Sequence, residues 1–168
     1  MLSVLLWHAL RPIEYVIGTA MNKVLVSTNH SHCSYHIYQT NQSDRPLMLL
    51  HGTNSDGLAS YGAFLDAFGH REIIVPDYAG CGDSSLPEHE LTVSALADQV
   101  IAIIQDRGCE HVDLVGHSLG ATVAAYVAAQ YPDFINRLVL MMTRAINWCL
   151  IPGKHSRKPH LNKQLRSD

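Results

Sequence analysis

The residues best suited to chemistry in this 168-residue chain form a short run in which a serine lies between two glycines. Gly116-His117-Ser118-Leu119-Gly120 follows a strand-like apolar stretch and opens an Ala-rich, helix-like stretch. In that setting a G-x-S-x-G pattern indicates a sharp turn that exposes the serine hydroxyl, while the start of the helix directs free N–H groups at any oxyanion. The pattern predicts a nucleophilic serine. The alternative is a plain tight turn with a capping serine.

The elements that must hold this turn are apolar stretches that alternate with amphipathic ones. Strands without polar alternation, separated by helices of about 10 to 18 residues, are typical of parallel strands buried on both faces. The sequence therefore predicts an α/β fold, doubly wound, with a mostly parallel sheet, helices on both faces and an initial antiparallel hairpin. We expect strands at 23–28, 33–39, 45–52, 111–116 and 135–142, a short strand with a Gly-rich loop at 72–85, and helices at 59–69, 91–108 and 118–132. Thr92 should cap the second helix and Gly108 should end it.

Charge is distributed unevenly along the chain. Twelve Lys and Arg face 15 Asp and Glu, a net charge of -3, so no domain-wide basic field exists to attract nucleic acid. Six of the 12 basic residues lie after Thr143, and such a composition shift is typical of a tail. We therefore predict a leader at 1–22, one domain at 23–143 and an irregular basic tail at 144–168.

The apolar first twenty residues raise the question of a targeting or membrane segment. They lack a basic start and a clear cleavage site, and Arg11 interrupts them. A dispensable leader before a second start at Met21 is favoured over a signal peptide or a membrane span. The four cysteines form no Cys-x-x-Cys pair, so we expect reduced thiols and a cytoplasmic protein; they are Cys33, Cys81, Cys109 and Cys149.

Three stretches together resemble the α/β-hydrolase family, in its serine-nucleophile esterase and lipase-like branch. Residues 115–132 resemble the family's nucleophile turn and following helix, 47–57 its strand and oxyanion loop, and 75–85 its D-x-x-G-x-G-x-S loop. Their order and spacing agree with the family, and the likeness covers residues 24–143. It is limited to the N-terminal half, so a truncated fold without the last strands and cap is implied.

The resemblance implies that Ser118 attacks an acyl carbonyl of a small carboxylic ester or thioester, giving an acyl-enzyme that water hydrolyses. The backbone amides of Thr53 and Leu119 would form the oxyanion hole, and His51 and Gly52 would shape the loop that presents Thr53. No cofactor and no metal are implied. In the loop after the next strand, four residues would be structural, through turns and local hydrogen bonds: Asp77, Gly80, Gly82 and Ser84.

The base and the acid of a triad are not identified. The family places an acid and then a histidine after the serine. The acidic side chains after Ser118 are Asp133, which precedes the last clear strand, and Asp168, while His155 and His160 both come before Asp168. His117 is not assigned as base, because its neighbouring position points it away from the serine. The sequence therefore predicts an impaired serine hydrolase.

Two alternatives remain open at this stage. The chain is either a non-catalytic binding or regulatory module, or one half of a split enzyme whose second chain brings the acid and the histidine. In each case the strand at 137–142 would be an apolar sheet edge, open to self-association.

One further cluster, His30, His32, Cys33 and His36, contains residue types that bind zinc. It straddles a hairpin and has no apparent acidic partner. A solvated turn is favoured over a metal site.

Overall fold

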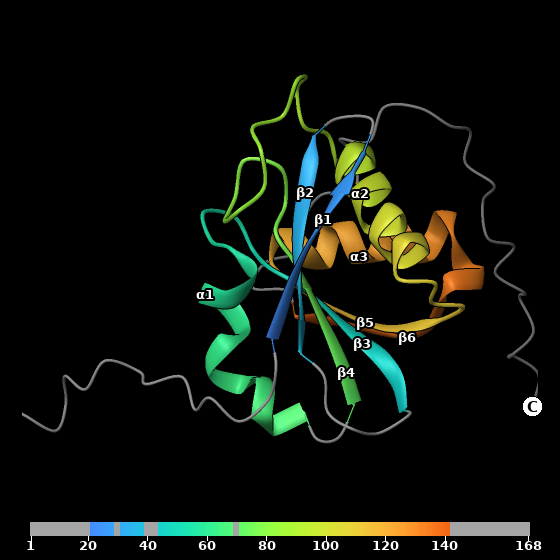
Figure 1. Ribbon diagram of the computed structural model, residues 1–168. Coiled ribbons are helices and arrows are strands. Elements are labelled where there is room, and N and C mark those ends of the chain that lie inside the picture. The colour runs from blue at the N-terminus through green and yellow to red at the C-terminus, as the bar shows by residue number, and fades with distance from the viewer. Residues whose placement is uncertain (1–20, 29–30, 39–43, 69–70, 142–168) are drawn as a thin grey trace, which may run out of the picture.

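A six-stranded sheet forms the centre of the protein, in the computed structural model that describes residues 21–28, 31–38, 44–68 and 71–141 (Figure 1). The strands are β1 (Met21–Ser27), β2 (His32–Tyr38), β3 (Asp44–Leu50), β4 (Arg71–Pro76), β5 (Val112–His117) and β6 (Ile135–Met141). The helices are α1 (Gly57–Tyr61), α2 (Val93–Asp106) and α3 (Leu119–Gln130), with short 3-10 turns η1 (Gly62–Phe68) and η2 (Pro132–Phe134). The predicted leader and tail lie almost wholly outside the described residues; β1 begins at Met21.

The strand order is β1-β2-β4-β3-β5-β6. β1 pairs antiparallel with β2 and β2 antiparallel with β4, whereas β4, β3, β5 and β6 run parallel to one another. The predicted fold class is confirmed: an initial hairpin leads into a parallel sheet. Because parallel strands end at the same edge, the loops after β3, β4 and β5 meet there.

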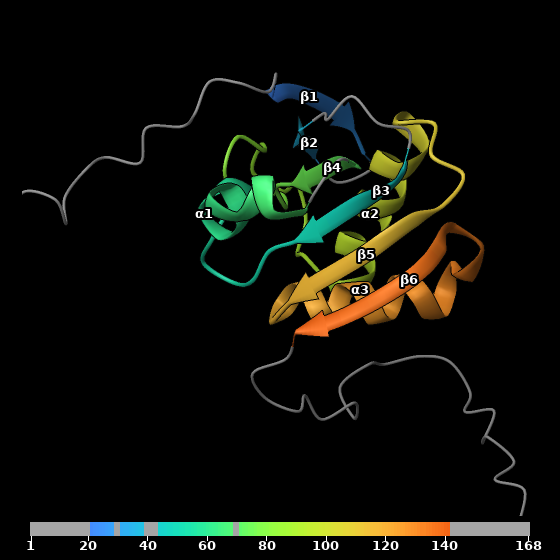
Figure 2. The same cartoon turned by 90° about the horizontal axis from the view of Figure 1, so that it is seen from below.

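Helices cover both faces of this sheet (Figure 2). α2 and α3 pack over one face, where Val100, Ile104 and Val123 are fully buried against Met48 and Leu114. On the opposite face the segment of α1 and η1 buries Tyr61 and Leu65 against strand residues. Burial on both faces explains why β3 and β4 read as continuous apolar runs rather than alternating ones.

Helix boundaries follow the expected capping chemistry at α2. The Thr92 side chain accepts a hydrogen bond from the amide of Ala95, and Gly108 adopts a positive φ of 68° just after the helix. The structure differs from the prediction of a single helix at 59–69. Asp56 caps an α-helix of five residues that begins at Gly57, and the chain then tightens into the 3-10 turn η1. Such a short helix depends on packing rather than on its own stability.

β6 is the edge of the sheet next to β5, and its last residues are exposed. Relative exposures are 38% for Leu138, 51% for Val139, 40% for Leu140 and 41% for Met141. α3 packs against the strand, and no other described strand pairs with its outer side. Among the described strands, β6 therefore has a neighbour on one side, β5, and the predicted self-association through this edge stays a prediction.

Candidate active site

Ser118 occupies a strained turn between β5 and α3. Its backbone has φ 54° and ψ -114°, a conformation that residues with a side chain rarely adopt. A hydrogen bond from the Ser118 amide to the carbonyl of Met141, 3.0 Å long, fixes the turn to the end of β6. The Ser118 side chain makes no capping hydrogen bond to α3. Its hydroxyl is therefore not used as a helix cap, which was the alternative to a nucleophile.

The two glycines of the motif are required by close backbone contacts. A Cβ on Gly116 would lie 2.2 Å from the carbonyl oxygen of Gly120, and one on Gly120 would lie 2.2 Å from the oxygen of Leu50. Heavy atoms of this kind cannot approach so closely. The sharp strand-to-helix reversal inferred from the G-x-S-x-G pattern is therefore present, and it is packed directly onto the end of β3.

The oxyanion loop lies beside the serine. β3 and β5 are adjacent parallel strands with Leu50 opposite Gly116, so the loop that follows Leu50 meets the turn that follows Gly116. A Cβ on Gly52 would lie 3.3 Å from the Cβ of Ser118. Thr53 follows Gly52 directly, and Leu119 is the first residue of α3, where amide groups have no partner within the helix. Both amides predicted for the oxyanion hole are thus on segments that flank Ser118.

His51 is fixed as a neutral ring that supports this loop. Its Nδ1 lies 2.8 Å from the carbonyl of Gly52, and its Nε2 lies 3.2 Å from the amide of Tyr78. A carbonyl only accepts and an amide only donates, so Nδ1 carries the proton and Nε2 accepts. Burial lowers the pKa of His51, and its ring centroid lies 4.5 Å from that of Tyr78, with the two rings tilted by 47°. Both nitrogens are occupied, so His51 positions the loop and is not a base for Ser118.

The loop after β4 is held by Asp77. Its carboxylate accepts hydrogen bonds from the amides of Gly57 at 2.8 Å and Asp83 at 3.2 Å. A Cβ on Gly82 would lie 2.3 Å from this carboxylate, so the wrapped loop tolerates only glycine there. The hydroxyl of Ser84 donates to the carbonyl of Asp77. These contacts are the local hydrogen bonds and turns expected for the D-x-x-G-x-G-x-S loop, in which Gly80 also has a positive φ.

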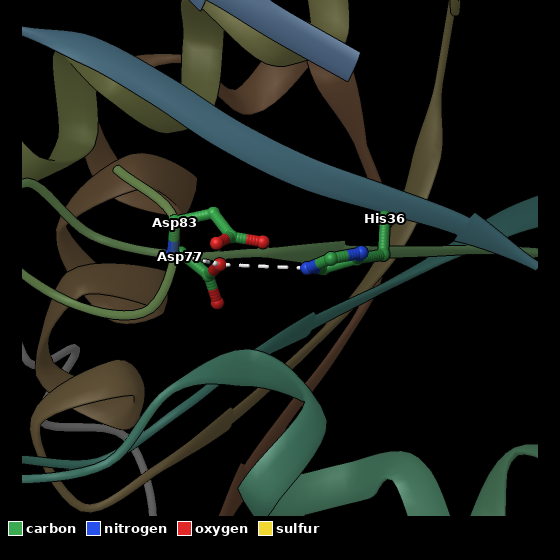
Figure 3. Close-up of side chains that lie close together, drawn as sticks. All are labelled: His36, Asp77 and Asp83. Carbon is green, nitrogen blue, oxygen red and sulfur yellow. Dashed lines mark hydrogen bonds and ion pairs between the residues drawn. The ribbon is translucent and has the colours of Figure 1, made fainter. Parts of the chain in front are cut away.

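A buried ion pair joins the same loop to β2 (Figure 3). The Nε2 of His36 lies 3.5 Å from an oxygen of Asp77, and both side chains are buried. Burial alone would raise the pKa of Asp77, but hydrogen bonds from His36 and from two backbone amides outweigh it, and the pKa is lowered. Sequence spacing gave no signal for this pair, because it connects β2 with the loop after β4.

His36, Asp77 and Asp83 are also the described residues whose side chains come closest to a metal-binding arrangement. Their ligand atoms lie within 4.8 Å of one another. However, Asp77 already accepts two amides, and Asp83 pairs with Lys23 at 3.1 Å. The polar atoms are satisfied within the chain, so the group acts as an anchor for the loop.

The possible zinc ligands His32, Cys33 and His36 lie on both faces of β2. Side chains alternate along a strand, so Cys33 points to the opposite face from His32 and His36. His32 is exposed and bonds to Ser27, whereas Cys33 is fully buried. His30 lies outside the described residues. Cys33, Cys81 and Cys109 are free thiols, and Cys149 is not described.

Four of the described histidines make side-chain contacts, and none of these contacts is with Ser118. His32, His36, His51 and His111 all bond elsewhere, the last to the carbonyl of Asp133. His117 is exposed and lies beside Gly52. His155, His160 and Asp168 lie outside the described residues, so the base and the acid stay unidentified.

A pocket of about 510 Å³ lies next to the turn that contains Ser118. The sequence did not predict this pocket. It is bordered by the loops after β3 and β4, by the start of α2 and by Leu119. Thr53 and Leu119, the two residues whose amides are predicted to bind an oxyanion, both line it. The lining residues come from four separated stretches, and no local sequence pattern marks such a meeting.

The chain belongs to the alpha/beta hydrolase fold family, which matches residues 45–164. It is 38% identical over 96 residues to a pyrrolizixenacetamide deacetylase of Xenorhabdus hominickii, covering 56% of this chain and 36% of that protein. A hydrolase of Pseudomonas aeruginosa PA01 superimposes with TM-score 0.66 and 25% identity, covering 71% of this chain and 45% of the other. The epoxide hydrolase CorEH superimposes with TM-score 0.65 and 26% identity, covering 71% and 41%. The chain thus spans less than half the length of each.

A helix that crosses a bilayer needs about 20 mostly apolar residues. Among the described helices, none has both the length and the apolar character needed for a span.

Proposed function

We propose that Ser118 is the nucleophile of a serine hydrolase that cleaves a carboxylic ester or thioester through an acyl-enzyme. The observation that carries the proposal is the position of this serine. It has a positive φ, it stands beside Gly52, and its hydroxyl is not used to cap α3. A serine held in this way presents its hydroxyl where a carbonyl can meet two backbone amides.

The oxyanion formed by the attack would be held by the amides of Thr53 and Leu119. Each such donor contributes roughly 3 kcal/mol to transition-state stabilisation in enzymes where one has been removed. The name of the Xenorhabdus relative, a deacetylase, supports acyl transfer as the reaction type. The likeness to an epoxide hydrolase shows that proteins with this fold catalyse different reactions. The proposal therefore depends on the serine and its surroundings.

We propose that the chain by itself hydrolyses its substrate slowly. A serine without a base keeps catalysis from the oxyanion hole, about 10³-fold over water, and loses a factor of about 10⁴ to 10⁶ of the full rate. No base or acid is assigned among residues 21–141, and the late histidines follow no acidic residue that could orient them in the family order.

Mass spectrometry of the chain treated with a fluorophosphonate tests both parts of the proposal. We expect slow labelling that maps to Ser118, disappears in Ser118→Ala and persists in Ser94→Ala, an exposed serine on α2. Labelling spread equally over several serines would contradict the nucleophile. Rapid, stoichiometric labelling of Ser118 would contradict the impairment, because it would require a working base.

A further inference from the structure

Gln99 is a polar side chain at a fully buried position of α2. It is 1% exposed, and its neighbours on the same side of the helix, Leu96 and Ile103, are buried apolar residues. An amide group in such a place costs free energy unless it is hydrogen-bonded, so an apolar side chain would serve packing better. The reason for a glutamine here therefore lies in the groups that its amide contacts.

The Gln99 amide contacts two segments outside α2. Its oxygen accepts a hydrogen bond from the amide of Ala79 at 3.3 Å, and its nitrogen donates to the hydroxyl of Ser31 at 3.5 Å. A backbone amide only donates, so the oxygen of the side chain must face Ala79. Ala79 is 3% exposed and lies beyond the end of β4. Gln99 thus supplies an acceptor to a buried N–H that the sheet does not pair.

The peptide between Tyr78 and Ala79 is held at both of its polar ends. Its carbonyl accepts the amide of Cys81 at 2.8 Å, and its N–H is the group that bonds to Gln99. The hydroxyl of Tyr78 has no hydrogen-bond partner in the described part of the chain, so it does not help to hold this segment. Without Gln99 the peptide would carry a buried N–H with no acceptor, and a rotation of the peptide would relieve that cost.

The preceding amide, that of Tyr78, connects this segment to the oxyanion loop. It donates to Nε2 of His51 at 3.2 Å, and Nδ1 of the same ring donates to the carbonyl of Gly52 at 2.8 Å. In a planar trans peptide the C=O and the N–H point in opposite directions. The Gly52 carbonyl and the Thr53 N–H belong to one such peptide, so the bond from His51 also sets the direction of the Thr53 N–H.

We propose that Gln99 is a positioning residue of the active site: through the loop after β4 and His51, it fixes the direction of the Thr53 N–H. The proposal rests on the proposed function of Ser118, since it concerns an amide assigned to the oxyanion hole. Three hydrogen bonds carry the effect from the core of α2 to the site, and none of them involves a substrate.

Three variants test this role. Gln99→Met keeps a similar length and volume and removes both the acceptor and the donor of the side chain. Gln105→Met is the same change at an exposed position of the same helix and is the control. Gln99→Glu keeps an oxygen that can accept the Ala79 amide, at the cost of an ionisable group in the core. If Gln99 served packing alone, methionine would be tolerated better than glutamate, whereas the proposal requires the reverse at the active site.

NMR of the full ¹⁵N-labelled chain follows the contacts directly. In the wild type, the N–H···N bond between Tyr78 and His51 should give a scalar coupling across the hydrogen bond, a measurement that depends on no variant. Gln99→Met should speed hydrogen exchange of the Tyr78 amide and shift the Thr53 amide, and the exposed control should change neither. The absence of the coupling in the wild type, or a Thr53 amide that does not respond to Gln99→Met, would overturn the proposal.

Fluorophosphonate labelling measures the effect on the site. The labelling rate of Ser118 should fall about tenfold in Gln99→Met, because a misplaced donor costs less than the about 10²- to 10³-fold loss on removing one. Gln105→Met should label within about twofold of the wild type. Gln99→Glu should recover most of the rate. Equal rates in all chains, or a slower rate for Gln99→Glu than for Gln99→Met, would contradict the positioning role.

The two measurements separate this proposal from the function proposed above. A Thr53 amide that responds to Gln99→Met in a chain never labelled at Ser118 would remove the nucleophile and leave the contacts from Gln99 to the loop. Labelling of Ser118 without any response of Thr53 would remove the positioning role and leave the nucleophile.

Discussion

The carbonyl oxygen of Leu50 occupies the place that a side chain on Gly120 would need: a Cβ there would lie 2.2 Å from it. This contact joins the end of β3 to the first turn of α3. The oxyanion loop and the nucleophile turn are therefore one packed unit rather than two neighbouring loops.

Gly120→Ala should break this unit. The added methyl group forces β3 and α3 apart, and overpacking of this kind costs about 3 kcal/mol of unfolding free energy. Urea denaturation followed by circular dichroism measures the loss. The control is Gly108→Ala, where the φ is positive but no atom lies within 4 Å of the new Cβ, so only backbone strain of about 1 kcal/mol is expected. Equal losses would show that the contact with Leu50 does not determine the effect.

Two buried tyrosines near the site should respond oppositely to loss of their hydroxyl groups. Tyr61 donates to the carbonyl of Leu50 at 2.8 Å, whereas the hydroxyl of Tyr78 has no hydrogen-bond partner within the described part of the chain. Tyr61→Phe should cost about 1 kcal/mol, because it deletes a buried bond. Tyr78→Phe should be neutral or stabilising, because a buried hydroxyl without a partner is unfavourable. Thermal denaturation of both variants checks the pair, and a larger loss for Tyr78→Phe would contradict the assignment.

The sequence was informative where a local pattern has a local cause. The glycines at 116 and 120, the cap at Thr92 and the stop at Gly108 each follow from steric or hydrogen-bonding needs within a few residues. The site contacts that it missed all join distant segments. His36 reaches Asp77 from another strand, and the pocket takes its walls from four stretches. No periodicity within a single segment encodes such meetings.

The helix expected at 59–69 illustrates the same limit. Tyr61 and Leu65 of its apolar spacing are buried, whereas Phe64 of the same spacing is 59% exposed. The spacing does not predict that an α-helix of five residues gives way to a 3-10 turn at Gly62. The two helix types place side chains at similar spacings, and packing against the sheet decides between them.

The anchor formed by His36 and Asp77 should make stability depend on pH. The folded state lowers the pKa of Asp77, so its contribution is present above the unfolded value of about 3.9 and is lost as the pH falls through the lower folded value. Asp77→Asn should cost about 3 kcal/mol at pH 6 and much less at pH 3. Urea denaturation at both pH values gives the difference. Asp83→Asn, on an exposed ion pair, serves as control and should change stability by less than about 1 kcal/mol.

The edge of β6 is expected to mediate self-association of the chain. Its last four described residues are all apolar and exposed, and β6 ends the order of the described strands, a position where backbone groups can pair with another chain. Val139→Lys should shift the chain toward the monomer in size-exclusion chromatography with light scattering. Leu86→Lys alters an even more exposed leucine, 80% exposed, in the loop before α2 and should leave association unchanged. If both variants act alike, general apolar exposure rather than the β6 edge is responsible.

The backbone strain at Ser118 should lower the unfolding free energy of the protein while it exposes the hydroxyl for reaction. A residue with a side chain at φ 54° costs about 1 kcal/mol or more relative to glycine, which adopts such backbones freely. Ser118→Gly should therefore raise the unfolding free energy by about 1 kcal/mol while abolishing labelling at this position. Ser94→Gly, in the first turn of α2, should instead lower it by a few tenths to about 1 kcal/mol. A destabilised Ser118→Gly chain would mean that the side chain contributes to folding, and the case for a hydroxyl reserved for chemistry would fail.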